Sequence, residues 1–209
     1  MRYLLLFDLI AIISLICLAL IRNFDEENGL TFGKGTVAAA VIYAAAAAGT
    51  AWNEQDIAKS VLLCFFFSYM VTASYCDHCT HYVYRFLYFM PFLAGIGYVL
   101  LRGISAEEVM SIGIYYLLVI CLFSKYYGRA DTVAFLISVF FLRQCDATGS
   151  YLLQGMIHML LSMLLLIVVK RKKINFRKGS MEPTAFMPYI AVMALAMITV
   201  RQIVEGSNL

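Results

Sequence analysis

Two aspartates stand out in this sequence because each adjoins a long apolar run, where carboxylates are scarce. Asp77 follows the apolar residues 60–75, and Asp131 precedes the apolar residues 132–142. Asp8 is near the start of the first apolar run, and the other acidic residues are expected in loops: Asp25, Glu26, Glu27, Glu54, Asp56, Glu107, Glu108, Asp146, Glu182 and Glu205. An ionisable side chain at membrane depth is costly, so such a residue indicates a functional role.

Two carboxylates at the same face of a membrane could hydrolyse an amide bond. Like charges a few ångströms apart do not both ionise readily, so the pair shares one proton. The charged member acts as general base on a water molecule, and the neutral member donates a hydrogen bond to the scissile carbonyl. Asp131 precedes a helix, whose dipole favours the ionised form, and we therefore expect Asp131 to be the base and Asp77 the proton carrier. The alternative is two separate helix-end residues, with Asp131 as an N-cap and Asp77 as an interfacial charge.

The composition indicates which elements must position these residues. The chain has 209 residues, of which 63% are hydrophobic and 14% charged, against roughly 45–50% and 25% in ordinary globular proteins. At roughly 20 residues per crossing, this length allows about eight membrane spans. A large extramembrane domain and a nucleic-acid-binding surface are thereby excluded, and a net charge of +3 is too small to indicate a polyanionic partner.

We predict an all-α, polytopic integral membrane protein with about eight transmembrane helices in a single membrane domain, residues 1–209. Two N-terminal spans (1–52) precede a six-helix core (58–204). The first span is expected to be retained, because no small-x-small cleavage site follows it. The apolar stretches are residues 3–21, 35–52, 58–76, 86–101, 109–124, 131–142, 151–169 and 186–204.

The distribution of basic residues predicts that the N-terminus is outside. In that orientation the inner loops hold 11 basic residues and the outer side 5, in line with the positive-inside rule. Both aspartates then face the cytoplasm. The cluster from Lys170 to Lys178 dominates this difference, and an anionic-lipid patch is the alternative interpretation of that cluster. The inner set is Arg22, Lys34, Arg85, Lys125, Arg129, Lys170, Arg171, Lys172, Lys173, Arg177 and Lys178.

The sixth apolar stretch is unusually short. Its 12 residues, 131–142, would make a helix of about 18 Å, whereas the hydrocarbon core is about 30 Å thick. Asp131 is therefore expected within the membrane profile, reached by an irregular turn at residues 128–130. Non-helical backbone at that depth is tolerated only where protein buries it or where it lines a wet cavity.

Three segments around these residues form a recognisable series. The first reads Ser74-Tyr75-Cys76-Asp77, with Arg85 further on, and the second reads Tyr127-Gly128-Arg129-Ala130-Asp131. After a basic loop, Pro183 and Pro188 bracket the start of the last span. In order and spacing, residues 59–200 resemble the type IV prepilin peptidases, which are membrane aspartic proteases of the GxGD kind.

The resemblance implies an aspartic endopeptidase of the cytoplasmic (inner) membrane. It would remove the short basic leader of type IV prepilin-like precursors at the cytoplasmic face, without cofactor or metal. Its partners would be the precursor and the lipid bilayer, with no nucleic acid. Asp77 and Asp131 would be catalytic, and the motif residues would be Gly128, Arg129, Ala130, Arg85 and Pro188.

The sequence departs from the family pattern at four places. Ala130 replaces the second glycine of the family's turn, and Tyr84 stands where the family has a proline. Pro183 and Pro188 are wider apart than is usual in the family. Large members carry paired Cys-x-x-Cys motifs linked to N-methylation between the first two spans. Residues 22–34 contain no cysteine, so the resemblance implies a peptidase without methyltransferase activity.

The remaining polar motifs receive simpler interpretations. Cys76-x-x-Cys79 with His78 and His81 lacks the second half-site of a structural zinc motif, and we expect a polar interfacial loop with reduced thiols. His158, inside the seventh span, is expected to hydrogen-bond a neighbouring helix. Two other functions stay open. One is a small transporter or channel that uses the two aspartates as a proton or cation site, and the other is an inactive, scaffolding relative.

Overall fold

The computed structural model describes residues 1–24, 30, 32–123, 128–144, 151–170 and 185–206. These residues form eight α-helices, which confirms the all-α prediction. Four of the helices, α1, α2, α3 and α8, are long and apolar enough to cross a membrane, as in a multi-pass membrane protein. The helices are α1 (Arg2–Phe24), α2 (Lys34–Asn53), α3 (Ile57–Thr80), α4 (Phe89–Arg102), α5 (Ala106–Phe123), α6 (Arg129–Gln144), α7 (Tyr151–Lys170) and α8 (Met187–Gly206), with a 3-10 turn, η1 (Arg85–Tyr88), before α4.

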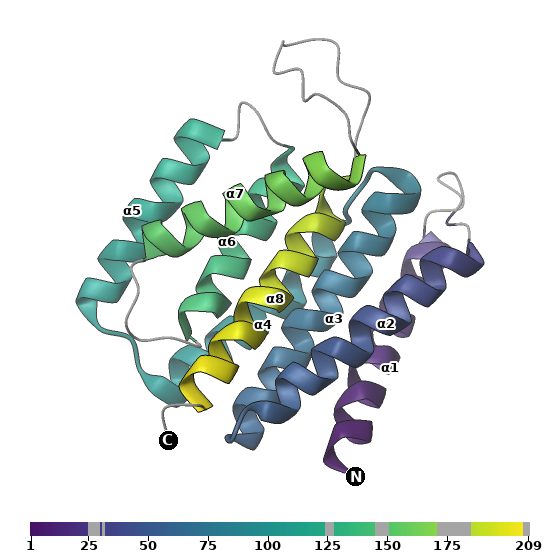
Figure 1. Cartoon of the computed structure of the whole chain (residues 1–209), viewed down its shortest axis with the longest axis horizontal. Helices are drawn as coiled ribbons and strands as arrows, with labels where there is room; N and C mark the ends of the chain where they lie inside the picture. The colour runs from purple at the N-terminus through teal and green to yellow at the C-terminus, as the bar shows by residue number, and fades with distance from the viewer. Residues whose placement is uncertain (25–29, 31, 124–127, 145–150, 171–184, 207–209) are drawn as a thin grey trace.

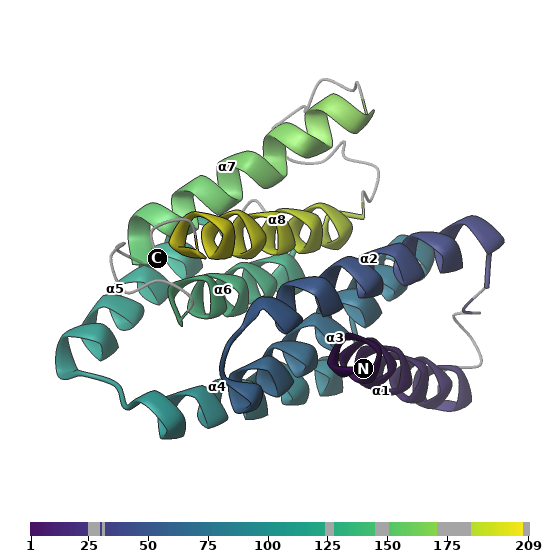
Figure 2. The same cartoon turned by 60° about the horizontal axis from the view of Figure 1, so that its bottom comes forward.

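Helix α3 is the centre of the bundle. It packs against α1, α2, α4 and α8, and α6 and α7 pack against the opposite side of α8 (Figure 1). Helix α5 lies at the edge, where its neighbours are α6 and α7 (Figure 2). The part of the molecule around α3 is therefore much more enclosed than the part around α5.

The distribution of polarity is that of a protein surrounded by lipid. Large apolar side chains are exposed along the outer helices, for example Leu117 on α5 and Leu160 on α7. Hydroxyl groups lie inside, where Ser68, Thr72 and Ser138 each donate to the carbonyl four residues earlier, at 2.7–2.8 Å. This local bond satisfies a hydroxyl that is buried inside the bundle. Soluble monomers rarely expose so much continuous apolar surface.

Helix α3 is longer than its apolar run. It continues through Asp77 to Thr80, so the expected loop around Cys76 and Cys79 is instead the last turn of a helix. The helix ends at His81, whose φ of 54° places it in the left-handed region and whose N–H donates to the Asp77 carbonyl at 3.0 Å. The residues of this last turn are polar, so the apolar stretch in the sequence ends before the helix does.

Helix α6 begins at Arg129, two residues before the expected start. The N–H of Thr132 donates to the Gly128 carbonyl at 3.0 Å, which closes the first helical turn. The irregular turn expected at residues 128–130 is thus largely helical. Among the described residues only His81 and Gly103 have positive φ, so Ala130 carries no conformational strain.

Three acidic residues expected in loops are helical instead. Glu107 and Glu108 belong to the first turn of α5, and Glu205 lies near the end of α8. Ser105 and Glu108 form a capping box, with N···O distances of 3.1 and 3.2 Å. The predicted basic cluster beyond Lys170, together with Pro183 and Tyr127, lies outside the described residues. The membrane orientation that depends on that cluster stays a prediction.

Candidate active site

The fold brings Asp77 and Asp131 together at one end of the helix bundle. Asp77 lies in the last turn of α3 and Asp131 in the first turn of α6, and the two carboxylates are close enough to interact electrostatically. Helix α8 begins at the same end (Figure 1). Residues 54 positions apart in the sequence therefore share one site.

The Asp77 carboxylate is bound to the beginning of α8. Its Oδ2 accepts a hydrogen bond from the Met187 N–H at 2.9 Å, and the Phe186 backbone is a second partner. The first N–H groups of a helix have no acceptor within their own helix, and a carboxylate there also benefits from the helix dipole. Asp77 is only 8% exposed. Its side chain thus caps a helix that begins 110 residues later.

The Asp131 carboxylate is bound within its own helix. It accepts a hydrogen bond from the Gly128 backbone, and a β-carbon added at Gly128 would lie 3.2 Å from Asp131 Oδ2. Gly128 is therefore the N-cap of α6, and Asp131 is the third residue of the helix. The Asp131 side chain accepts a hydrogen bond from the backbone of this N-cap residue. The expectation that Asp131 is the N-cap is wrong by three residues, because the helix begins earlier.

Two tyrosines complete the surroundings of Asp131. Tyr69 on α3 and Tyr88 in η1 have ring centroids 5.9 Å apart, and both interact electrostatically with Asp131. The Tyr69 hydroxyl is fully buried and has no hydrogen-bond partner in the part of the chain that the structure describes. A buried hydroxyl without a partner beside a carboxylate can receive a bound water or a substrate group.

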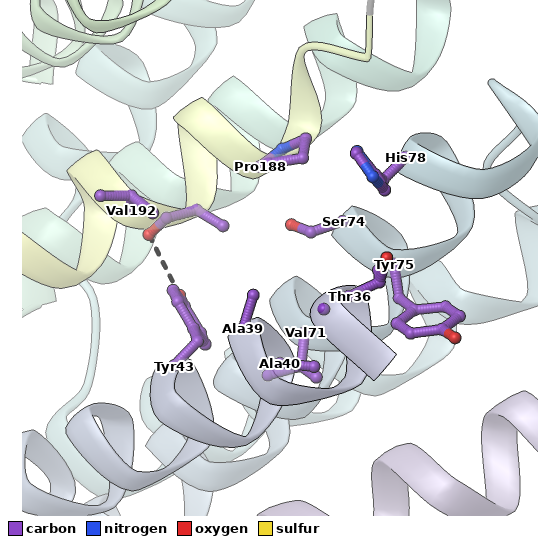
Figure 3. Close-up of a pocket in the computed structure, with 12 residues that line it drawn as sticks. Thr36, Ala39, Ala40, Tyr43, Val71, Ser74, Tyr75, His78, Pro188 and Val192 are labelled. Carbon is purple, nitrogen blue, oxygen red and sulfur yellow. Dashed lines mark hydrogen bonds between the residues drawn. The ribbon is translucent and has the colours of Figure 1, made fainter. Parts of the chain in front are cut away.

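The other motif residues lie around this pair at different depths. Arg129 is exposed at the start of α6, and Arg85 is exposed at the start of η1, where it interacts with Tyr88. Ala130 is half-buried against the core. Pro188 follows Met187 in α8 and lines a groove between α2, α3 and α8 (Figure 3). The structure thus brings these residues near the two aspartates but shows no direct contact of either arginine with a carboxylate in the described part of the chain.

His158 lies near the site without belonging to it. Its Nε2 donates to the Ile190 carbonyl of α8 at 3.1 Å, which confirms the expected bond to a neighbouring helix. Its ring contacts Phe135 edge-on, with centroids 5.3 Å apart, and Phe135 also contacts Phe186. Within the described residues, no group of three His, Cys, Asp or Glu side chains could hold a metal ion.

Three participants in this site were missed by sequence reasoning. The Met187 N–H is a backbone group, and the only sequence signal for it is Pro188, which often follows the start of a helix. Tyr69 and Tyr88 were not singled out in the sequence. Their polar ends gave no signal, because a tyrosine facing lipid and a tyrosine facing a carboxylate look the same in a sequence.

Chemically, the pair offers two carboxylates in a largely buried setting, with a helix N-terminus on one side and two phenols on the other. Such a pair can hold one proton and can activate a water molecule. Each carboxylate also has a structural partner of its own.

Comparison with protein-family models, curated proteins and solved structures finds no match to this chain.

Proposed function

We propose that this protein is an intramembrane aspartic endopeptidase that removes the short basic leader of type IV prepilin-like precursors. The observation that carries the proposal is the meeting of Asp77 and Asp131, from separate helices, at one largely buried site. The order of the sequence motifs supports the substrate class. In this proposal the chain crosses the inner membrane eight times with its N-terminus outside, and the aspartates face the cytoplasm.

The proposed reaction needs no covalent intermediate. The ionised aspartate takes a proton from water, whose oxygen attacks the scissile carbonyl carbon, while the protonated aspartate donates to the carbonyl oxygen. Collapse of the tetrahedral intermediate breaks the C–N bond, and the leaving nitrogen takes a proton from the pair. The capping bonds favour charge on both carboxylates, whereas their proximity and burial favour one shared proton.

The test is co-expression with pilin-like precursors from the same genome, with leader loss read by intact mass. We expect a leader-sized mass loss with the wild type and none with Asp77→Asn or Asp131→Asn. Asp8→Asn is the matched control, because Asp8 is an exposed aspartate of α1, and it should process normally. Unchanged processing by both site variants would overturn the proposal. A folded wild type that cuts no precursor would favour the inactive, scaffolding relative.

A second candidate function, proton or cation transport, is supported by a separate group of buried polar side chains. Gln154 on α7 is 6% exposed. Within the described ranges, neither of its amide atoms has a hydrogen-bond partner, and neither does the hydroxyl of Tyr115 on α5. His158 Nδ1 is likewise unpartnered. Such atoms at membrane depth can line an ion or proton path. Ion flux in liposomes that requires Asp77 and Asp131, without proteolysis, would establish this function instead.

A further inference from the structure

Two grooves of similar size flank the aspartate pair. The first, here called the α2/α8 groove, has a volume of about 440 Å³ and is lined by α2, α3 and α8. The second, the α4/α5 groove, has about 470 Å³ and is lined by α4, α5 and α6. Cavities of this size accept a small ligand or a few side chains. The two differ in what lines them and in which aspartate they approach.

The α2/α8 groove begins beside Asp77. Ser74 and His78 lie one turn before and one residue after Asp77 on α3, and Pro188 follows the residue whose N–H binds the Asp77 carboxylate. Figure 3 shows these three residues around one end of the groove. At the other end the Tyr43 hydroxyl donates to the Ala191 carbonyl at 3.1 Å and ties α2 to α8. Thr36 to Tyr43 spans about 10 Å of helix, or two turns.

Apart from Tyr43 at its far end, the α2 wall of this groove is made of small residues. Gly35, Thr36, Ala39 and Ala40 line it, and a β-carbon added at Gly35 would meet nothing within 4 Å. Small side chains let a second helix approach closely within a membrane. This wall therefore leaves room for a helix, whereas the α4/α5 groove is lined by large side chains such as Phe92 and Phe140.

Ser74 supplies a polar group inside the groove. The four other serine and threonine hydroxyls of α3, those of Ser60, Ser68, Thr72 and Thr80, donate to the carbonyl four residues earlier. The Ser74 hydroxyl has no partner among the described residues although its oxygen is buried, and Figure 3 shows it directed into the groove. A lipid acyl chain has no hydrogen-bonding group to offer it, whereas a peptide backbone does.

We propose that the α2/α8 groove receives the side chains on one face of the first two turns of the apolar segment that follows the scissile bond of the precursor. The Ser74 hydroxyl bonds a backbone group of that segment next to the cleavage point, where the chain leaves its helix to reach the aspartates. The α4/α5 groove, whose lining is apolar apart from two tyrosine hydroxyls, is left to lipid. This inference rests on the proposed function and adds the side from which the substrate enters.

Two neighbouring alanines of α2 provide a matched test. Ala38 and Ala39 are both exposed, but only Ala39 lines the groove. We expect Ala39→Phe to lower leader removal about tenfold by filling the space for the segment, and Ala38→Phe to leave it within about twofold. Ser74→Ala should raise KM several-fold with little change in kcat, since it removes a binding contact.

Disulfide cross-linking gives a second readout that keeps the groove open, because cysteine is much smaller than phenylalanine. Cysteine is placed at position 39, 38 or 96 in the Asp77→Asn background and paired with one cysteine in the apolar segment of the precursor, and Ile96 represents the α4/α5 groove. Oxidation should join the precursor to position 39 well above the level seen with position 38, position 96 or the protein without an added cysteine. Capture at position 96 and not at position 39 would overturn the inference even if the wild type cleaves normally.

The two proposals fail in different ways. If the wild type removes leaders and Ala39→Phe does so equally well, only the groove assignment falls. If the wild type removes none, the peptidase function falls and the groove assignment falls with it.

Discussion

The two aspartates of this protein are held in opposite ways. Asp77 is fixed by tertiary structure, because its partner is the Met187 N–H of a helix that begins 110 residues later. Asp131 is fixed locally, because its partner is Gly128, three residues earlier in the same turn. One carboxylate therefore depends on the packing of α3 against α8, and the other depends on the first turn of α6. Two aspartates that share one site can thus be held in place by different kinds of contact, one tertiary and one local.

The strongest test of the comparison asks whether the pair nevertheless acts as a unit. We expect each single Asn variant to lose about 10²–10⁴-fold in leader removal, as is typical of a general acid or base. The Asp77→Asn/Asp131→Asn double variant should be no worse than either single variant, because groups that share a step are not additive. Rates of leader removal measured by mass spectrometry check this. Losses that multiply would mean that the two aspartates act separately.

The next effect concerns the local support of Asp131. Gly128→Ala places a β-carbon 3.2 Å from Asp131 Oδ2, which should displace the carboxylate and lower activity about ten- to hundredfold. Gly113→Ala is the matched control, since a β-carbon there meets nothing within 4 Å. Equal activity of the two variants would show that Asp131 tolerates the displacement.

The difference in support should also appear in stability. Asp77→Ala leaves the buried Met187 N–H without its acceptor and should lower the free energy of unfolding by about 2 kcal/mol. Asp131→Ala removes only a capping contact at a half-buried turn, and we expect about 1 kcal/mol. Thermal unfolding in the same detergent compares the two, with Asp77→Asn as the control that keeps an acceptor oxygen. A larger loss for Asp131→Ala would reverse the comparison.

The smallest expected effect concerns the position where the sequence departs from the Gly-x-Gly-Asp turn. Ala130 is helical and half-buried, so Ala130→Gly should cost about 1 kcal/mol in stability. Because no positive φ is needed there, leader removal should stay within about twofold of the wild type. A marked rise in activity on restoring glycine would show that Ala130 restrains the site.

The helices themselves could be predicted well from the sequence. The starts of α7 and α8 were expected at residues 151 and 186, and the structure has them at Tyr151 and Met187. Continuous apolar runs determine such elements because the backbone of a lipid-embedded segment must satisfy its own hydrogen bonds. Several ends were misplaced, among them Thr80 of α3, Ala106 of α5 and Arg129 of α6. At these ends polar residues continue a helix and hydropathy gives no signal.

The candidate site was predictable only in part. The sequence singled out Asp77 and Asp131, since a carboxylate beside an apolar run is rare, and it predicted that they lie at the same face. It could not indicate the Met187 N–H, the buried hydroxyls of Tyr69 and Ser74, or the two grooves. Those features arise where α3 meets α2, α6 and α8, and a hydropathy pattern does not encode which face of a helix meets which neighbour.

The sequence by itself thus determined an all-α architecture of eight apolar helices with two isolated carboxylates. The reason is that the composition and the pattern of apolar residues set how many residues of the chain can lie in lipid. Only the tertiary structure decided which helix N-terminus Asp77 binds and how the two carboxylates are brought together. The physical reason is that hydrogen-bond partners and cavities depend on distances between segments up to 110 residues apart.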